Sequence, residues 1–284
     1  MYIWPMDAKV TLLLILANVI FSILGFSNSQ FFERYLFRIG DIRKKRQYER
    51  LLTSGFLHVD YMHLTFNMFT LYFFGSFLEN RIQIPIPVYA SLYFISLLAG
   101  NILALWLNKN KLEYAAVGAS GAVSGILFAT IALYPDLTLG LFFVIPMPAW
   151  LYGIGFMLYS LFGMRSKNRN IGHEAHLGGA LAGIIGACVL YPQILERHLL
   201  IISLMTFPSL IFLFISIKFP YLLEASFYKK KPNFPIDIDA EFYENKQREE
   251  QEINRILEKI NAWGIESLSS EERIKLERWK NKIS

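Results

Sequence analysis

A serine inside an apolar segment is the first residue of this chain whose surroundings suggest chemistry. Ser120 stands in the sequence GASGAVSG, where small residues surround it at the start of an apolar run. Two interpretations compete. Small residues such as Gly121 and Gly125 allow two membrane helices to approach closely, or they expose the Ser120 hydroxyl as a nucleophile. A serine hydroxyl becomes an effective nucleophile only when a neighbouring base takes its proton.

A histidine in a second apolar segment is the candidate base. The sequence HEAHLGGALAG places His173 and His176 three positions apart, and Gly179 and Gly183 follow them. These glycines share one face of a helix. We expect that face to pack against the small residues around the serine, because glycine stripes favour close helix contacts. Such packing would bring Ser120 within reach of His176.

Two polar residues in a third segment can stabilise a negatively charged intermediate. His63 and Asn67 are four positions apart and therefore lie on one helical face. A ring N–H, an amide NH₂ and the backbone N–H of Ser120, which begins a helix and lacks an intrahelical acceptor, are suitable oxyanion donors. Interhelical hydrogen bonding is the alternative for His63 and Asn67. We assign His58 and His173 to structural or interfacial roles.

The sequence HEAH is one residue short of the zinc motif HExxH. His173 and His176 are separated by three positions and have no further ligand pair downstream, so a zinc site is not predicted. Cys188 is the single cysteine, which excludes an intramolecular disulfide and a thiolate metal cluster. We expect neither a metal nor another cofactor.

The composition indicates a membrane protein with several spans. Of the 284 residues, 54% are hydrophobic and only 18% are charged, which is atypical of a soluble globule. A transmembrane helix needs about 20 mainly apolar residues. The predicted spans are approximately 10–25, 61–78, 86–107, 119–134, 139–163, 174–191 and 199–217. The first has no cleavage site after it, so we expect a retained helix.

The connection between the first two spans is rich in aromatic and basic residues. We expect Phe31, Phe32, Tyr35, Leu36 and Phe37 to lie in the membrane interface with the neighbouring arginines toward headgroups. The formal charge of +5 is small for a nucleic-acid-binding protein. Because the cations cluster beside spans, lipid headgroups and not nucleic acid are the expected partners.

The chain divides into regions of different character. We predict a transmembrane core over 1–192, an additional transmembrane helix over 193–220, a basic, proline-containing linker over 221–240 and a charged helical tail over 241–284. In the tail, Ile253, Ile256, Leu257 and Ile260 have helical spacing. Gly264 is a predicted helix end, and Ser269 with Glu272 predicts a capping box at the start of a second helix.

Taken together, the motifs resemble the rhomboid family of intramembrane serine proteases. They are HxxxxHxxxN at His58, His63 and Asn67; Glu79 at the end of that helix; GxSG at 118–121; and AHxxGxxxG at 175–183. Their order on the second, fourth and sixth predicted spans carries the resemblance, which runs from about Gln47 to Tyr191.

The resemblance implies roles for these residues. Ser120 would be the nucleophile and His176 the base, with His63, Asn67 and the Ser120 amide as the oxyanion hole. Structural positions near the site would be Gly118, Gly121, Gly179, Gly183 and Glu79, the last joining helix ends to the first loop. The implied fold is an all-α polytopic membrane bundle with a six-helix rhomboid core, to which the apolar run 199–217 adds a seventh transmembrane helix. A short fourth helix would start within the membrane at a water-filled cavity.

The implied function is cleavage of transmembrane segments of other membrane proteins, so the expected partners are transmembrane substrates and the lipid bilayer. The expected location is a bacterial cytoplasmic (inner) membrane, as a multi-pass protein. The alternative is a non-catalytic rhomboid-like protein that binds membrane clients, although such relatives usually lack the serine and histidine present here. A small-solute transporter would predict inverted repeats, and the sequence has no such symmetry. The sequence does not fix the oligomeric state.

The chain departs from the family pattern in particular places. Some members have an aromatic residue four positions after the nucleophile that stacks on the catalytic imidazole, whereas here that residue is Ser124. Another group must then orient His176. The first loop lacks a Trp-Arg pair seen in bacterial members. The last span and the tail lie outside the six-helix core, and the tail is similar to tails of rhomboid-like proteins in some bacteria.

Two criteria for membrane orientation disagree. The positive-inside rule favours a cytoplasmic location for the basic stretch 43–50 and for Arg165, Lys167 and Arg169. The family orientation places both loops on the outer side, with the candidate active site. We favour the family orientation, because interfacial segments can hold the first loop's cations at headgroups. With seven spans, the tail would then also be outside.

Overall fold

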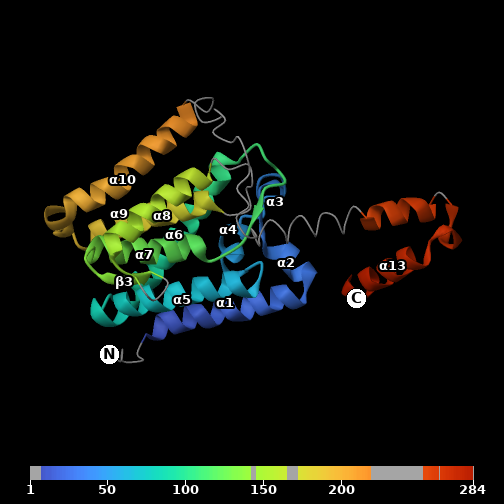
Figure 1. Cartoon of the computed structure of the whole chain (residues 1–284), viewed down its shortest axis with the longest axis horizontal. Helices are drawn as coiled ribbons and strands as arrows, with labels where there is room; N and C mark the ends of the chain where they lie inside the picture. The colour runs from blue at the N-terminus through green and yellow to red at the C-terminus, as the bar shows by residue number, and fades with distance from the viewer. Residues whose placement is uncertain (1–7, 142–144, 165–171, 219–251, 262, 284) are drawn as a thin grey trace.

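The computed structural model describes residues 8–141, 145–164, 172–218, 252–261 and 263–283. Long helices lie side by side in a bundle, as Figure 1 shows. They are α1 (Lys9–Ser27), α5 (Tyr61–Ser76), α6 (Ile86–Leu107), α7 (Ser120–Leu133), α8 (Ala149–Gly163), α9 (His173–Leu190) and α10 (Ile194–Lys218). In length and composition, α1, α6, α9 and α10 can each cross a membrane. The predicted all-α polytopic class with a seventh long helix is confirmed.

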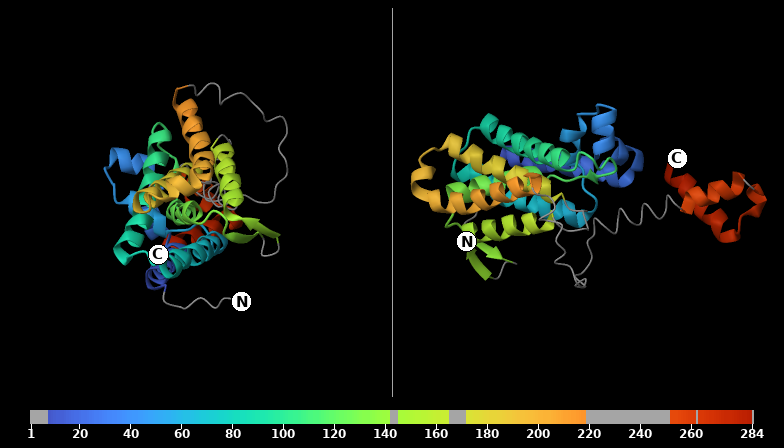
Figure 2. Two further views of the ribbon diagram at one scale, coloured as in Figure 1. Left: turned by 90° about the vertical axis from the view of Figure 1, so that its left-hand side faces the viewer. Right: turned by 90° about the horizontal axis from the view of Figure 1, so that it is seen from above.

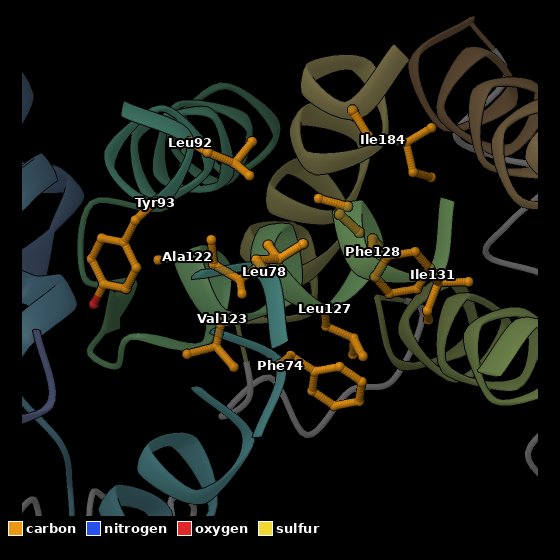
Figure 3. Close-up of a cluster of buried hydrophobic side chains, with 14 of the residues drawn as sticks. Phe74, Leu78, Leu92, Tyr93, Ala122, Val123, Leu127, Phe128, Ile131 and Ile184 are labelled. Carbon is orange, nitrogen blue, oxygen red and sulfur yellow. The ribbon is translucent and has the colours of Figure 1, made fainter. Parts of the chain in front are cut away.

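Helix α7 occupies the centre of the bundle. Its residues 121–132 are all buried, and Figure 3 shows its side chains pointing outward on several sides toward neighbouring helices. Val123 and Leu127 share one cluster with Phe74 of α5 and Tyr93 of α6. With 14 residues, α7 is roughly 21 Å long at 1.5 Å per residue. It is therefore shorter than the hydrocarbon core of a bilayer, about 30 Å.

The fifth predicted span, 139–163, is wrong in its first half. The strands β3 (Thr138–Leu141) and β4 (Ile145–Pro148) form an antiparallel hairpin there, and only the second half is the helix α8. The hairpin projects from the side of the bundle (Figure 2). The physical reason is proline: Pro146 and Pro148 have no amide hydrogen to donate within a helix, and each disfavours helical backbone in the residue before it.

The first loop folds into short elements, and several of its apolar side chains are buried against other parts of the protein. The elements are α2 (Ser29–Tyr35), β1 (Phe37–Arg38), α3 (Ile39–Lys44), α4 (Arg50–Thr53) and the 3₁₀ turn η1 (Ser54–Phe56). Phe32, Leu36 and Phe37 are buried, so the interfacial prediction is wrong for them. Phe32 and Leu36 pack in one cluster with Leu57, and Phe37 packs in another with Ile42.

A buried arginine organises this loop. Arg50 donates hydrogen bonds to the carbonyl oxygens of Glu33 (2.9 Å) and Leu36 (2.6 Å), and it pairs with Asp41 at 3.2 Å. Burial alone would raise the pKa of the Asp41 carboxyl, but the hydrogen bond from Lys45 and the charge of Arg50 outweigh it, so the pKa lies below its ordinary value. Asp41 therefore stays ionised and holds the cations of the loop together.

Strand β1 connects the first loop to the segment that leads into α7. It pairs antiparallel with β2 (Ala115–Ala116), with Phe37 opposite Ala116 and Arg38 opposite Ala115. Backbone hydrogen bonds thereby fix the chain just before Gly118. The first loop thus contributes to placing the start of α7, although it contributes no side chain to the cavity there.

Glu79 lies in η2 (Phe77–Arg81), a π-helical turn after α5, and it holds the start of α1. Its carboxylate accepts hydrogen bonds from the backbone amides of Val10 (2.8 Å) and Thr11 (3.0 Å) and from the Thr11 hydroxyl (2.9 Å). The partner is therefore the first helix and not the first loop that the resemblance implied. A carboxylate at a helix N-terminus satisfies free amides and complements the helix dipole.

Replacement of this carboxylate is expected to destabilise the fold. Glu79→Ala leaves the first amides of α1 without their acceptor, so we expect the free energy of unfolding to fall by about 2 kcal/mol, the scale of a hydrogen bond to a charged group. Thermal unfolding of the purified protein in detergent measures the change. Glu196→Ala, at an exposed position of α10, is the control, and an equal effect in both variants would contradict this role for Glu79.

The tail forms a small helical unit with its own core. Residues 252–261 are helical, and η3 (Ile265–Ser267) and α13 (Ser270–Ile283) follow. Ile253, Ile256 and Leu268 are buried together. Gly264 has a φ of +75° at the predicted turn. Glu272 accepts from the Ser269 amide at 2.7 Å and donates its own amide to the Ser269 hydroxyl at 3.2 Å, which is the predicted capping box.

Candidate active site

The candidate nucleophile stands at the first residue of α7, directly after a backbone turn that requires glycine. Gly118 has a φ of +131°, a conformation that side-chain-bearing residues rarely adopt. Its amide donates to the Ser54 carbonyl oxygen at 3.0 Å. A Cβ on Gly118 would lie 3.0 Å from Nε2 of His63 and 3.7 Å from Oγ of Ser120. The missing side chain therefore leaves space that His63 and Ser120 both face.

His58 supports the residue before the nucleophile. The Ala119 amide donates to Nε2 of His58 at 3.4 Å, and Nδ1 of His58 lies 2.8 Å from the Ser22 hydroxyl. Since Ser22 donates to the Phe56 carbonyl oxygen at 3.0 Å, the pattern fits an imidazole with its hydrogen on Nδ1. Fully buried His58 thus joins α1 to the turn before Ser120, which is a structural role.

Helix α5 presents His63 and Asn67 to the same space. Asp60 caps the helix by accepting the His63 amide at 2.8 Å, which fixes the first turn. The Asn67 amide group donates to the His63 carbonyl oxygen at 2.9 Å. That bond uses one N–H of the Asn67 side chain and leaves its second N–H and the His63 ring as donors on one helical face.

Glycines bring α9 against α7 and so place His176 opposite the start of α7. A Cβ on Gly179 would lie 1.9 Å from the Gly121 carbonyl oxygen, and one on Gly183 would lie 2.1 Å from that of Gly125. Only residues without a side chain permit backbones this close. The two predicted glycine stripes therefore face each other, as the sequence suggested.

These elements surround one cavity of about 260 Å³. Its lining includes His63, Asn67, Ser120, Ser124, Phe156 and His176. Ser120 and His176 both line the cavity, but within the described residues their side chains form no hydrogen bond with each other. In unliganded enzymes, hydrogen bonds between catalytic groups often form or shorten only when substrate binds. The cavity brings together a hydroxyl, an imidazole base and two further hydrogen-bond donors, which is the set that acyl transfer requires.

The family comparison agrees with this arrangement. Residues 45–193 match the family model described as the rhomboid domain. The chain belongs to the rhomboid family. The matched segment contains all four helices that line the cavity, α5, α7, α8 and α9.

Similar proteins include rhomboid proteins of organelles. RHOMBOID-like protein 12, mitochondrial, of Arabidopsis thaliana is 32% identical over 195 residues, which cover 63% of this chain and 57% of that protein. Rhomboid protein 1, mitochondrial, of Saccharomyces cerevisiae is 31% identical over 140 residues, 48% of this chain and 40% of that protein. Presenilin-associated rhomboid-like protein, mitochondrial, of Mus musculus is 30% identical over 142 residues, 47% and 36% of the respective chains. The chain therefore covers only 36–57% of the length of these relatives.

Beyond the rhomboid domain, residues 236–282 match a family described as of unknown function (DUF6576). The tail therefore has relatives of its own. The rhomboid relatives named above are mitochondrial, and they give no support to the expectation of a bacterial cytoplasmic membrane. What they support is a multi-pass membrane protein.

The aromatic partner of His176 comes from α8 and was not found from the sequence. Where some rhomboids have an aromatic residue, Ser124 of this chain is buried and its side chain is too small to stack. Phe156 instead lies against His176, with ring centroids 5.6 Å apart and planes tilted by 35°. The only available signal was the absence of an aromatic at Ser124, because the aromatic-rich segment 150–162 does not single out Phe156.

The other residues of the HEAH sequence serve different contacts. Glu174 is buried and accepts hydrogen bonds from the Asn108 amide at 2.9 Å and the Tyr114 hydroxyl at 3.3 Å. It thereby ties the first turn of α9 to the segment between α6 and β2. The ring of His173 lies 5.9 Å from that of His176.

The donor role of Asn67 can be tested by deletion. Asn67→Ala removes a donor that lines the cavity; under the peptide-cleavage function that the resemblance implies, we expect kcat to fall by about 10²-fold, as single oxyanion-donor deletions do. The measurement is turnover of a labelled transmembrane peptide in detergent. Thr65→Ala, at an exposed position of α5, is the matched control and should retain full turnover. An unchanged kcat for Asn67→Ala would return Asn67 to a packing role.

Proposed function

We propose that this protein is an intramembrane serine endopeptidase that cuts transmembrane segments of other membrane proteins. The observation that carries the proposal is the common cavity, in which Ser120 at the start of α7 and His176 on α9 lie beside His63 and Asn67. Four side chains of complementary chemistry from three helices meet in a bundle whose interior is otherwise mainly apolar. Polar side chains inside a membrane-spanning bundle are costly and tend to mark functional sites.

The geometry suggests the following steps. The Ser120 hydroxyl attacks the scissile carbonyl carbon while His176 takes its proton as general base. The oxyanion of the tetrahedral intermediate accepts hydrogen bonds from the Ser120 backbone N–H, the Asn67 amide and the His63 ring. Protonated His176 then gives its proton to the leaving amine, and the acyl group stays on Ser120.

A water molecule completes the reaction. His176 takes a proton from the water as it attacks the acyl-enzyme, and the same donors stabilise the second oxyanion. The acid is released and the Ser120 hydroxyl is regenerated by proton return from His176. No metal or cofactor enters this scheme, because the serine and the imidazole supply the nucleophile and the proton transfers.

The substrate must present an extended peptide bond to Ser120. A transmembrane helix has all its backbone groups paired within the helix, so its peptide bonds are shielded until the helix locally unwinds. Glycine and proline favour such unwinding. We therefore propose transmembrane segments with helix-destabilising residues as the substrate class.

The test compares two labelled peptides and uses the purified protein in detergent. One peptide is an apolar 20-residue helix interrupted by a Gly-Pro pair, and the other has the same length with leucine at both positions. Faster cleavage of the interrupted peptide, together with a phosphonate probe that labels Ser120, supports the proposal. A protein that cleaves neither peptide and does not react with the probe would instead be a rhomboid that binds membrane clients without cutting them.

A further inference from the structure

The catalytic imidazole of the proposed mechanism depends on packing for its orientation. Within the described residues, Nδ1 of His176 is buried and has no hydrogen-bond partner. In serine hydrolases a carboxylate usually fixes this nitrogen. Within the described residues, the His176 ring contacts Phe156, at 5.6 Å with a tilt of 35°, and His173, at 5.9 Å with a tilt of 79°. These contacts therefore restrict rotation of the ring.

Both contacts lead to helix α8. Phe156, Tyr159 and Gly163 recur at helical spacing and form one stripe along α8. The Tyr159 ring meets the His173 ring at 5.0 Å. A Cβ on Gly163 would lie 2.3 Å from Nε2 of His173, so His173 presses directly on the α8 backbone. The stripe thus supports the His173 and His176 imidazoles together.

The additional helix α10 supports α8 on another face. Met205 of α10 is fully buried, and its sulfur would lie 3.2 Å from a Cβ on Gly153. One turn further along α10, the Ser209 hydroxyl donates to the sulfur of Met157 at 3.6 Å. Helix α8 is therefore held between the imidazoles of α9 on one face and the side chains of α10 on another.

We propose that α8 positions the catalytic base, with Phe156 taking over the stacking that an aromatic residue at position 124 would provide. This inference rests on the proposed protease function. An aromatic at position 124 would hold the imidazole through α7, the same helix that carries the nucleophile. Here the support comes from a different helix, so displacement of α8 would remove the stacking partner of His176 without moving Ser120. Phe156 is a positioning residue and touches no reacting atom in the proposed scheme.

The experiment measures kcat and KM for Phe156→Ala and Phe156→Leu with the interrupted transmembrane peptide. Loss of the aromatic contact is expected to lower kcat roughly tenfold, the scale of one aromatic pair converted to a rate, with little change in KM. Phe156→Leu keeps most of the volume and removes only the aromatic face, so it should show the same defect. Phe162→Ala, on α8 with 66% of the side chain exposed, is the matched control and should keep the wild-type kcat.

Rescue distinguishes positioning from general packing. Ser124→Tyr introduced together with Phe156→Ala should recover most of the lost kcat, because the ring would again lie beside His176, now from α7. An unchanged kcat in Phe156→Leu, or a defect that Ser124→Tyr does not relieve, would overturn the proposal. Neither result bears on the protease assignment, which fails only if the wild type and Ser120→Ala cleave the peptide at the same rate.

Discussion

Ser120→Ala is expected to lower kcat for transmembrane-peptide cleavage by roughly 10⁶-fold, the scale measured when a serine protease loses its nucleophile. The substitution removes one oxygen at the wall of the cavity and leaves the packing of α7 in place. We therefore expect the same thermal unfolding temperature as the wild type. Cleavage followed by mass spectrometry, with the unfolding temperature beside it, makes the measurement.

Combining Ser120→Ala with His176→Ala tests whether the two residues act together. A nucleophile and its base act as one unit, so removing both should cost hardly more than removing either. We expect the double variant to cleave at the rate of Ser120→Ala. If the loss of kcat in the double variant equalled the product of the two single losses, Ser120 and His176 would act independently. A wild-type rate in either single variant would contradict the proposed mechanism.

Gly179→Ala is expected to have the second largest effect, on the fold as well as on the rate. Its new Cβ would lie 1.9 Å from the Gly121 carbonyl oxygen. A backbone atom cannot move aside as the end of a flexible side chain can. Overpacking of this kind costs roughly 1–3 kcal/mol. The strain also separates α9 from α7 beside the site, and a 1 Å displacement of reacting groups can cost 10²-fold in rate.

The chain offers a matched glycine for this experiment. A Cβ on Gly155, within α8, would meet nothing within 4 Å, so Gly155→Ala should be neutral or slightly stabilising because alanine is the better helix former. Unfolding temperature and kcat are measured for both variants. Equal behaviour of the Gly179 and Gly155 variants would contradict the close contact of α7 and α9.

The sequence predicted the structural features that hydrophobic periodicity and composition determine. Apolar runs located the long helices, and Gly179 and Gly183 marked the face of α9 that meets α7, because close backbone contact leaves small residues at helical spacing. Ser120, His63 and Asn67 could be selected because polar side chains are rare within spans. The capping box in the tail could be predicted because it is a hydrogen-bond pattern between residues close together in the sequence.

Contacts between distant segments were less accessible. Phe156 lies among other aromatic residues, and only the three-dimensional arrangement shows that its ring reaches His176. The partner of Glu79 is the backbone of Val10, and a backbone amide has no sequence signature. The β3–β4 hairpin was missed because the span assignment weighed hydropathy above the prolines of that segment.

The burial of α7 has a consequence for how the bilayer acts on this protein. Residues 121–132 are buried by protein, so lipid does not contact this part of the helix that begins at Ser120. A thicker or thinner bilayer is accommodated by helices that face it, through tilt and local deformation. The position of Ser120 relative to the bilayer is therefore set by its protein neighbours, and under the proposed function membrane thickness would determine which peptide bond of a substrate reaches Ser120.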